Sequence, residues 1–426
     1  MESLQVIASF DWLEKEEEIG RLYYEDFRGD GVFSFEYSNE WLKKHSDIGI
    51  GTDLRPFTGI QYPHERKDIF CSFADSLPDY WGRKLIALKI NQKCRDENIP
   101  LQNVSEWDYL KETDDFLRLG ALRYKDERTG EYVGSSAKNQ VPPLLSLEEL
   151  YEASRHIEDC IISYETPEKR WVERLFKPGS SVGGARPKAC VVDGEELYIA
   201  KFPSVTDMAD NAKWEYFANK IAENCGIRTA KTRICHLSTD KNVFLSKRFD
   251  RSTEGKRIHM ASAVSLLGIP PSQISKDIHH YSEIADLIIS IGCNVEDSLE
   301  ELYRRIALNI CIGNGDDHLK NHAFLLTRKG WELSPVYDIN PDFAKGHALL
   351  IDNYSNESSL DILFNAHKDY HLSVDVAYGV IKDVINAMTH WEITASECGL
   401  KNNEIDVYRE RFDFGTKWKY NEPSRG

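Results

Sequence analysis

Residues 310–321 read Ile-Cys-Ile-Gly-Asn-Gly-Asp-Asp-His-Leu-Lys-Asn, and His322-Ala-Phe-Leu-Leu follows them. Asp316 and Asn321 stand five positions apart in this stretch. A carboxylate can orient a hydroxyl group and accept its proton, while an amide oxygen can ligate a divalent cation. The pairing therefore predicts a loop that activates a hydroxyl nucleophile beside a metal ion, and the apolar run after it predicts a β-strand.

A second acidic residue is expected to reach the same cation. The apolar segment Trp331-Glu-Leu-Ser-Pro-Val-Tyr ends at Asp338, so two short strands would bring Asp338 to the metal held by Asn321. The separation of Asp316 and Asn321 is that of a protein-kinase catalytic loop, in which the aspartate is the base and the asparagine binds Mg²⁺. Tyr337-Asp-Ile-Asn departs from the D-F-G string of such kinases.

A glycine-rich string, Gly179-Ser-Ser-Val-Gly-Gly-Ala-Arg-Pro-Lys188, is a candidate phosphate loop. Adjacent glycines let backbone N–H groups approach phosphate oxygens without obstruction by a Cβ atom. The string is not a Walker A motif, but it resembles the looser class of loops that lie over ATP. Taken alone, it is explained more simply as a flexible surface turn.

Lys201 strengthens the nucleotide interpretation. It follows Tyr198-Ile-Ala in an otherwise apolar strand, 17 residues beyond Gly184. In a kinase, a lysine at this place contacts the ATP phosphates and a glutamate on the next helix, for which Glu215 is the candidate. The alternative is that Lys201 and Glu215 merely lie on solvated faces of their strand and helix.

Two other functions use the same residues. His318 and His322 have i, i+4 spacing, and with Asp316, Asp317 and Asp338 they would suit a metal-dependent hydrolase. However, no H-E-x-x-H string is present, and Leu319-Lys-Asn offers no general base between the histidines. A catalytically inactive binding scaffold is compatible with the spacing as well, although the complete set of Lys, Asp, Asn and Asp argues against it.

The chain is expected to fold as three sections. Residues 1–145 mix short apolar runs with helical stretches and end in a polar linker; Ser146 and Glu149 then form a capping-box pattern that predicts a helix start. Residues 146–255 contain strands, including a hairpin through Asp193-Gly194, and a helix from about Asp210 to Gly226. Residues 256–426 are mainly helical, with helices predicted over 281–291 and 299–312. A strand-rich small lobe before a helix-rich large lobe is the layout of a kinase.

Composition limits the possible environments and partners. The 426 residues include no apolar run of membrane-spanning length, and the start lacks the pattern of a secretory signal. Nine scattered cysteines without a C-x-x-C pair predict single thiols in a reducing cytoplasm and no zinc site. A net charge of −17 disfavours tight DNA binding by this chain alone.

Together these strings resemble the HipA family of toxin kinases from type II toxin–antitoxin modules. The matching segments are Leu77-Pro-Asp-Tyr-Trp-Gly-Arg83, Ser181-Val-Gly-Gly-Ala-Arg-Pro-Lys188, Ala200-Lys-Phe-Pro, Glu215-Tyr-Phe, Ser246-Lys-Arg-Phe-Asp-Arg251, Asp316-Asp-His-Leu-Lys-Asn321 and Pro335-Val-Tyr-Asp338. The resemblance implies an α+β, protein-kinase-like bilobal fold. It would have a strand-rich small lobe, an all-helical large lobe and an extra N-terminal α/β module.

The resemblance also implies a function and a set of site residues. The protein would be an ATP- and Mg²⁺-dependent serine/threonine kinase, with an aminoacyl-tRNA synthetase as the known type of target. A small helix-turn-helix antitoxin would neutralise it, and operator DNA would be bound only through that complex. Asp316 and Lys201 would be catalytic, Asn321 and Asp338 would hold the metal, and Glu215 would pair with the lysine. Ser181 would be autophosphorylated, with its neighbour Ser180 as the alternative. The implied nucleotide-binding residues are Val182, Gly183, Gly184, Ala185, Arg186, Lys188, Lys201, Lys247, Phe249, His318 and Lys320; Lys247 stands where the family often has glutamate.

Overall fold

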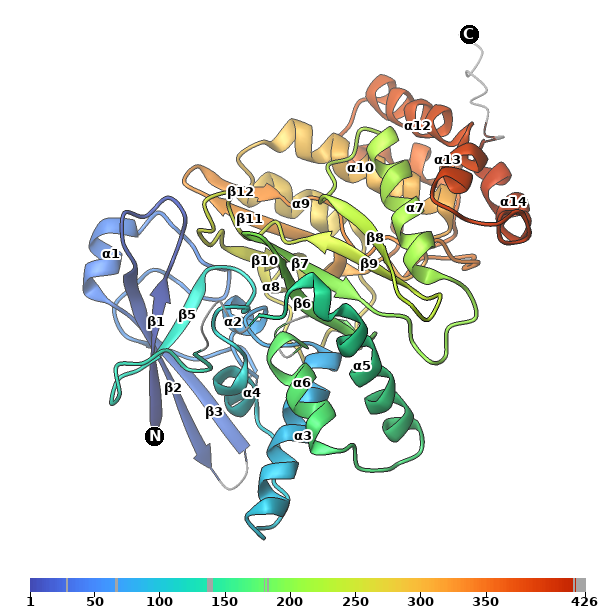
Figure 1. The fold of residues 1–426 in the computed structure, drawn as a ribbon. Helices are drawn as coiled ribbons and strands as arrows, with labels where there is room; N and C mark the ends of the chain where they lie inside the picture. Colours follow the sequence, from blue (N-terminus) through green and yellow to red (C-terminus); the bar gives the residue numbers. More distant parts are fainter. Residues whose placement is uncertain are drawn as a thin grey trace. The chain divides into compact units, whose positions relative to one another are not determined.

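A computed structural model describes residues 1–27, 30–65, 68–135, 141–179, 181, 184–416 and 418 (Figure 1). The chain divides into two compact units. Unit 1 comprises Met1–Met208, Arg233–Asp277 and Ala323–Gly330, and unit 2 comprises Ala209–Thr232, Ile278–His322 and Trp331–Gly426. Each unit is therefore assembled from segments that are far apart in the sequence.

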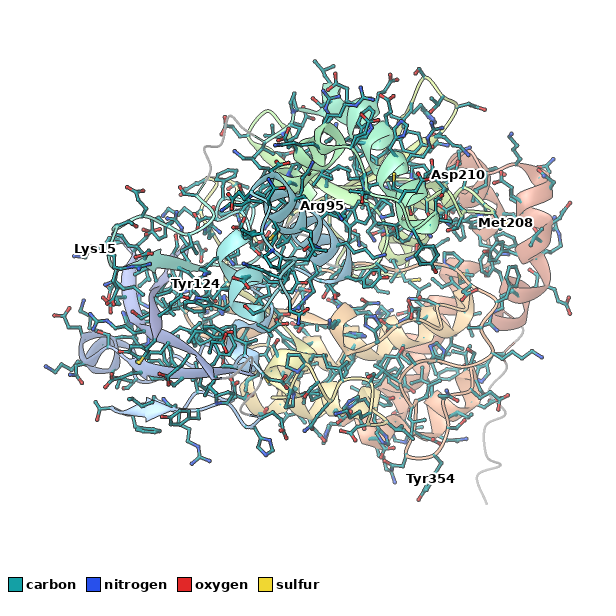
Figure 2. All side chains as sticks on the ribbon, turned by 90° about the horizontal axis from the view of Figure 1, so that it is seen from below. Lys15, Arg95, Tyr124, Met208, Asp210 and Tyr354 are labelled. Carbon is teal, nitrogen blue, oxygen red and sulfur yellow. The ribbon has the colours of Figure 1, made fainter. Side chains whose placement is uncertain are left out.

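Unit 1 begins with an antiparallel sheet of strand order β4-β3-β2-β1-β5. Its strands are β1 (Glu2–Ala8), β2 (Glu17–Phe27), β3 (Asp30–Tyr37), β4 (Ile60–Gln61) and β5 (Leu122–Asp126), accompanied by α1 (Asn39–His45), α2 (Cys71–Ala74), α3 (Tyr80–Asp96) and α4 (Glu106–Glu112). Phe33, Phe35 and Tyr37 alternate along β3 and are all buried, because side chains two apart share one face of a strand. Tyr124 of β5, labelled in Figure 2, is also buried.

A second antiparallel sheet of unit 1 has the order β6-β7-β9-β8. It consists of β6 (Lys188–Asp193), β7 (Glu196–Lys201), β8 (Thr232–His236) and β9 (Asn242–Lys247). Asp193 pairs with Glu196 across the predicted Asp-Gly turn, which confirms the hairpin. Helices α5 (Leu147–Ile162) and α6 (Lys169–Gly179) share a hydrophobic core with this sheet, and Trp81 and Leu85 of α3 belong to the same core.

The capping box predicted at Ser146 is wrong, although α5 does start at Leu147. Ser146 is also the last residue of a 3-10 helix, Leu144–Ser146, and has φ −88° and ψ 3°. A capping side chain usually needs an extended backbone to reach the free N–H groups of the first turn, and Ser146 makes no such hydrogen bond.

Unit 2 is mainly helical. Its helices are α7 (Asn211–Asn224), α9 (Tyr281–Ile291), α10 (Val295–Ile312), α11 (Leu360–Asn365), α12 (Val374–Met388), α13 (Trp391–Glu397) and α14 (Asn402–Thr416). The periodicity therefore predicted α9, and most of α10, correctly. Residues 305–312 of α10 are buried all round, and the helix packs against α9, α11, α12 and α14. At the surface, Tyr354 projects from a turn and is almost fully exposed (Figure 2).

The remaining elements lie before and after residues 310–321 in the sequence. Unit 1 contains β10 (Met260–Ser262), which pairs with β11 (Ala323–Thr327), and α8 (Ala263–Leu266). The chain passes from unit 1 to unit 2 within β12 (Gly330–Leu333). The strands predicted after Asn321 and around Trp331 are thus confirmed. Among the helices of the described residues, none has the length and apolar character needed to cross a bilayer.

Acid is expected to destabilise the protein through two buried histidines. Burial is the main cause that lowers the pKa of His259 and of His347 from 6.5 to about 4. Between these values the unfolded chain binds protons that the folded chain does not, so stability falls as the pH drops below 6.5. Each histidine should cost about 2 kcal/mol between pH 6.5 and pH 5.

Urea unfolding at pH 7 and pH 5 would measure this loss. His347→Gln should lose about 2 kcal/mol less than the parent between the two pH values. His64→Gln is a matched control, because this side chain is largely exposed and should keep the full loss. An acid-induced loss that is identical in the parent and in His347→Gln would contradict the prediction.

Candidate active site

Helix α10 delivers the loop that carries Asp316 and Asn321. The helix ends at Gly313, which has φ +71° and therefore a left-handed backbone. A Cβ atom there would lie 2.3 Å from the carbonyl oxygen of Asp342, so only glycine fits this turn. Asp316 is exposed, and the side-chain amide of Asn321 donates a hydrogen bond to the backbone carbonyl of Asp316 at 3.3 Å. The structure thus brings the predicted base and the predicted metal ligand together.

Asp338 is tied to the same loop through its neighbour. The Tyr337 hydroxyl donates to the carbonyl oxygen of Lys320 at 2.5 Å, so the residues that precede Asp338 and Asn321 are in direct contact. Asp338 itself has φ +58°, a strained conformation that aspartate tolerates better than most residues. Strained backbone of this kind clusters at functional sites. The side-chain oxygens of Asn321 and Asp338 fit Mg²⁺, which needs few protein ligands when water or phosphate completes its shell.

The histidines are not arranged as a hydrolase metal site. His322 Nε2 lies 3.0 Å from Asp317 Oδ2, and both side chains are buried. His318 and His322 flank a single 3-10 turn, Leu319–Asn321, instead of sharing the face of an α-helix. No group of three or more His, Cys, Asp or Glu side chains in the described part of the chain is suited to hold a metal ion. The contact with Asp317 accounts for His322 without a metal ion.

The start of α3 is hydrogen-bonded to the glycine-rich loop within unit 1. The backbone N–H of Trp81 donates to the carbonyl oxygen of Gly184 at 3.1 Å, and its indole N–H donates to that of Lys188 at 3.0 Å. The N–H of Gly184 in turn donates to Asp79 Oδ2 at 3.3 Å. Sequence reasoning treated residues 77–83 only as a family signature. Nothing local in the string indicates that it supports a loop a hundred residues away.

Gly184 and two lysines form the described part of the candidate phosphate site. Gly184 has φ +86°, and a Cβ atom there would lie 2.4 Å from the Lys188 amine. Lys188 is only 6% exposed and stands directly opposite Lys201 in the register of β6 and β7. The two lysines are thus neighbours on paired strands, as the predicted phosphate site expects. Val182 and Gly183 lie outside the described residues.

Residues 180–408 match the family model described as the HipA-like C-terminal domain, and residues 12–105 match that of the HipA N-terminal domain. The chain belongs to the HipA family.

Relatives and a solved structure agree with this membership. The serine/threonine-protein kinase toxin HipA of Shewanella oneidensis is 25% identical over 238 residues, which are 48% of this chain and 54% of that protein. A Haemophilus influenzae relative is 26% identical over 179 residues, or 38% of this chain and 52% of the relative. The chain thus spans about half the length of these curated relatives.

The structure of the Shewanella oneidensis MR-1 toxin–antitoxin system HipA, HipB and operator DNA complex aligns over 97% of this chain and 96% of that chain. The TM-score is 0.63 at 16% sequence identity, so this likeness concerns the fold alone. It confirms the predicted α+β, kinase-like fold.

Several residues that the HipA resemblance assigns to the nucleotide are engaged elsewhere. Arg186 forms an ion pair with Asp207, and Lys247 Nζ lies 2.7 Å from Glu196 Oε1. These pairs are partly exposed and are therefore weak, so they leave both side chains available to a stronger partner. Of the others, Ala185 is exposed, while Phe249, His318 and Lys320 are half-buried.

The side chains of Glu215 and Ser181 are both buried. Glu215 lies on α7 and is 5% exposed, so it does not lie on a solvated helix face. It belongs to unit 2 and Lys201 to unit 1, so their ion pair remains a prediction. Ser181 is 3% exposed and lies beside the thiol of Cys190. Burial raises the pKa of that thiol, whereas Arg248 and the Ser181 hydroxyl act in the opposite direction.

The segment Ser246-Lys-Arg-Phe-Asp-Arg251, which resembles the hinge string of the HipA family, contains a buried charge cluster. Asp250 accepts hydrogen bonds from both Arg248 and Arg251 and from the backbone N–H of Gly120. Burial alone would raise the pKa of Asp250, but the two guanidinium groups outweigh it and hold the pKa far below its usual range. Arg248 also donates to the carbonyl oxygen of Leu117 at 2.6 Å. The string therefore anchors residues 116–120 to the end of β9, a role that the sequence did not indicate.

Proposed function

We propose that this chain is an ATP- and Mg²⁺-dependent serine/threonine-protein kinase and the toxin of a toxin–antitoxin module. The contact between Asp316 and Asn321, together with the tie from Tyr337 to Lys320, is the observation that carries the proposal. It supports the proposal that Asp316 is the base and that Asn321 and Asp338 are the metal ligands of phosphoryl transfer. Membership in the HipA family supports the same activity.

Each unit would contribute a separate part of the chemistry. In unit 1, Lys188, Lys201 and the backbone of Gly184 would bind the phosphates. In unit 2, Asp316 would orient the attacking hydroxyl and accept its proton, while Asn321 and Asp338 would hold Mg²⁺. The metal ion, when bound, would neutralise charge on the transferring phosphoryl group.

The proposed partners follow from the family and from the charge. A small helix-turn-helix antitoxin would bind the chain and supply the basic surface that operator DNA requires, because this chain carries a net charge of −17. The protein substrate would carry an accessible serine or threonine, with an aminoacyl-tRNA synthetase as one candidate.

A labelling experiment tests the activity. The purified protein, Mg²⁺ and γ-labelled ATP are incubated with a cell lysate, and the labelled proteins are identified. Labelled serine or threonine in another protein is the expected result. Release of inorganic phosphate without labelled protein would indicate a hydrolase, and the absence of both ATP binding and turnover would indicate a binding scaffold.

Autophosphorylation of Ser181 is expected to switch the enzyme off. A phosphoserine adds about −1.5 to −2 charges and three oxygens, which the buried position beside Cys190 cannot accommodate without displacing the loop. Prolonged incubation with Mg²⁺ and ATP should therefore label Ser181 and weaken ATP binding about tenfold or more.

Mass spectrometry and nucleotide titration would follow both effects. Ser181→Ala should remain unlabelled at this position and keep its ATP affinity, and Ser181→Asp should mimic the inactive form only in part. Phosphate on Ser180 instead would move the site by one residue. An active enzyme with no phosphate anywhere in the loop would rule out this form of control.

A further inference from the structure

Asp316 and Asp317 are adjacent but lie in opposite environments. Asp316 is exposed, whereas Asp317 is 3% exposed beneath the loop. Removing a carboxylate from water costs several kcal/mol unless hydrogen bonds and nearby charge compensate for it. The burial of Asp317 therefore calls for an explanation in its contacts.

Three donors converge on one oxygen of Asp317. Its Oδ2 accepts from the Tyr281 hydroxyl at 2.8 Å and from the Asn309 amide at 2.7 Å, and it lies 3.0 Å from His322 Nε2. Burial alone would raise the pKa of Asp317, but His322 and Tyr281 outweigh burial and the pKa is lowered. The carboxylate is thus charged at neutral pH and binds α9, α10 and the end of the loop at one point.

The Asp317–His322 contact runs parallel to the contact between Asp316 and Asn321. Each joins residues five positions apart, and the two contacts are offset by one residue along the same loop. Asp316 precedes Asp317 directly in the chain, and Asn321 precedes His322. A fixed contact between Asp317 and His322 therefore also limits how far Asp316 can move from Asn321. The buried contact of Asp317 therefore supports the partly buried contact between Asp316 and Asn321.

The loop is also held from its other side. The N–H of Ala348 donates to the carbonyl oxygen of Gly315 at 2.8 Å. A Cβ atom on Gly315 would lie 2.3 Å from Ala344 Cβ and 2.7 Å from the carbonyl oxygen of Gly346. Segment 344–348 thus closely covers Gly315, the residue before Asp316, while the side-chain contacts of Asp317 fix the position after it.

We propose that Asp317 is a positioning residue for phosphoryl transfer, which holds Asp316 and Asn321 at their working separation through Tyr281 and His322. Asp317 touches neither substrate nor metal in this role. The inference rests on the proposed kinase function. A misplacement of about 1 Å at reacting groups can cost about a hundredfold in rate, so a loosened loop should lower the rate of transfer more than the binding of nucleotide.

Tyr281→Phe tests the proposal, because it removes one hydrogen bond and leaves the ring in place. We expect kcat to fall about tenfold to a hundredfold, with the KM for ATP within about threefold of the parent. Tyr303→Phe is the matched control: Tyr303 is equally buried in unit 2, and its hydroxyl donates to the carbonyl oxygen of Leu363 at 2.8 Å. It should leave kcat within about twofold. Equal losses of kcat in the two variants would overturn the proposal.

Hydrogen–deuterium exchange provides a readout that does not depend on activity. Peptides that cover residues 313–322 should exchange faster in Tyr281→Phe than in the parent or in Tyr303→Phe. If the parent transfers no phosphate, the proposed function fails, yet faster exchange would still support the loop-anchoring role of Asp317. Unchanged exchange in Tyr281→Phe would overturn that role even in an active kinase.

Discussion

Asp316→Asn should abolish phosphoryl transfer and leave nucleotide binding intact. General-base catalysis contributes about 10²- to 10⁴-fold, and an amide cannot accept the proton of the attacking hydroxyl. The substitution should leave the loop structure unchanged. Asn321 contacts the backbone carbonyl of Asp316, so a change of the Asp316 side chain leaves that contact in place. The exposed side chain also contributes little to stability.

Single-turnover transfer and a fluorescent-nucleotide titration would separate the two effects. Transfer should fall about a thousandfold while the nucleotide Kd stays within about twofold. Asp383→Asn, an exposed aspartate on α12, is the control for the loss of one surface charge and should behave as the parent. Transfer by Asp316→Asn at the parent rate would show that the base lies elsewhere.

Asp338→Asn should lose metal-dependent nucleotide binding as well as transfer. The carboxylate is the charged member of the proposed pair of metal ligands, and its conversion to an amide removes one charge next to Mg²⁺. Asparagine adopts a positive φ as readily as aspartate, so the strained backbone at φ +58° is retained. Alanine would be a poorer choice, because it would combine the loss of a ligand with backbone strain.

A Mg²⁺ titration of nucleotide binding would measure this effect. The Mg²⁺ dependence should weaken about tenfold or more, and transfer should fall about a thousandfold. Asp240→Asn is the matched control, because Asp240 also has a positive φ of 57° but lies in the turn between β8 and β9. Parent-like Mg²⁺ dependence in Asp338→Asn would remove Asp338 from the metal site.

The features that sequence predicted well are local ones. Helix α9 was predicted from apolar spacing and the β6–β7 hairpin from Asp193-Gly194. Each signal acts over a few residues, where spacing fixes geometry directly. The failed capping box at Ser146 is local too, but there a preceding 3-10 turn took the place of the extended backbone.

The features that sequence missed depend on partners far along the chain. Asp317 appeared only as a possible metal ligand, because its donors Tyr281 and Asn309 are recognisable only when α9 and α10 are folded together. The string Ser246–Arg251 likewise contains a charge cluster that the sequence did not reveal, because a backbone carbonyl that accepts from Arg248 lies more than a hundred residues earlier. Burial and pairing of this kind are set by tertiary packing, which no short pattern encodes.

The three hydrogen bonds between the start of α3 and the glycine-rich loop limit which residues of this segment can vary during evolution. All three hydrogen bonds end on main-chain atoms of the loop, namely the N–H and carbonyl of Gly184 and the carbonyl of Lys188. Substitutions at loop positions such as Ala185 and Arg186 leave these atoms unchanged, so evolution can vary them while the loop stays attached. The start of the helix cannot vary in this way, because the side chains of Asp79 and Trp81 supply two of the three bonds. Selection should therefore act more strictly on Asp79 and Trp81 than on the loop that they support.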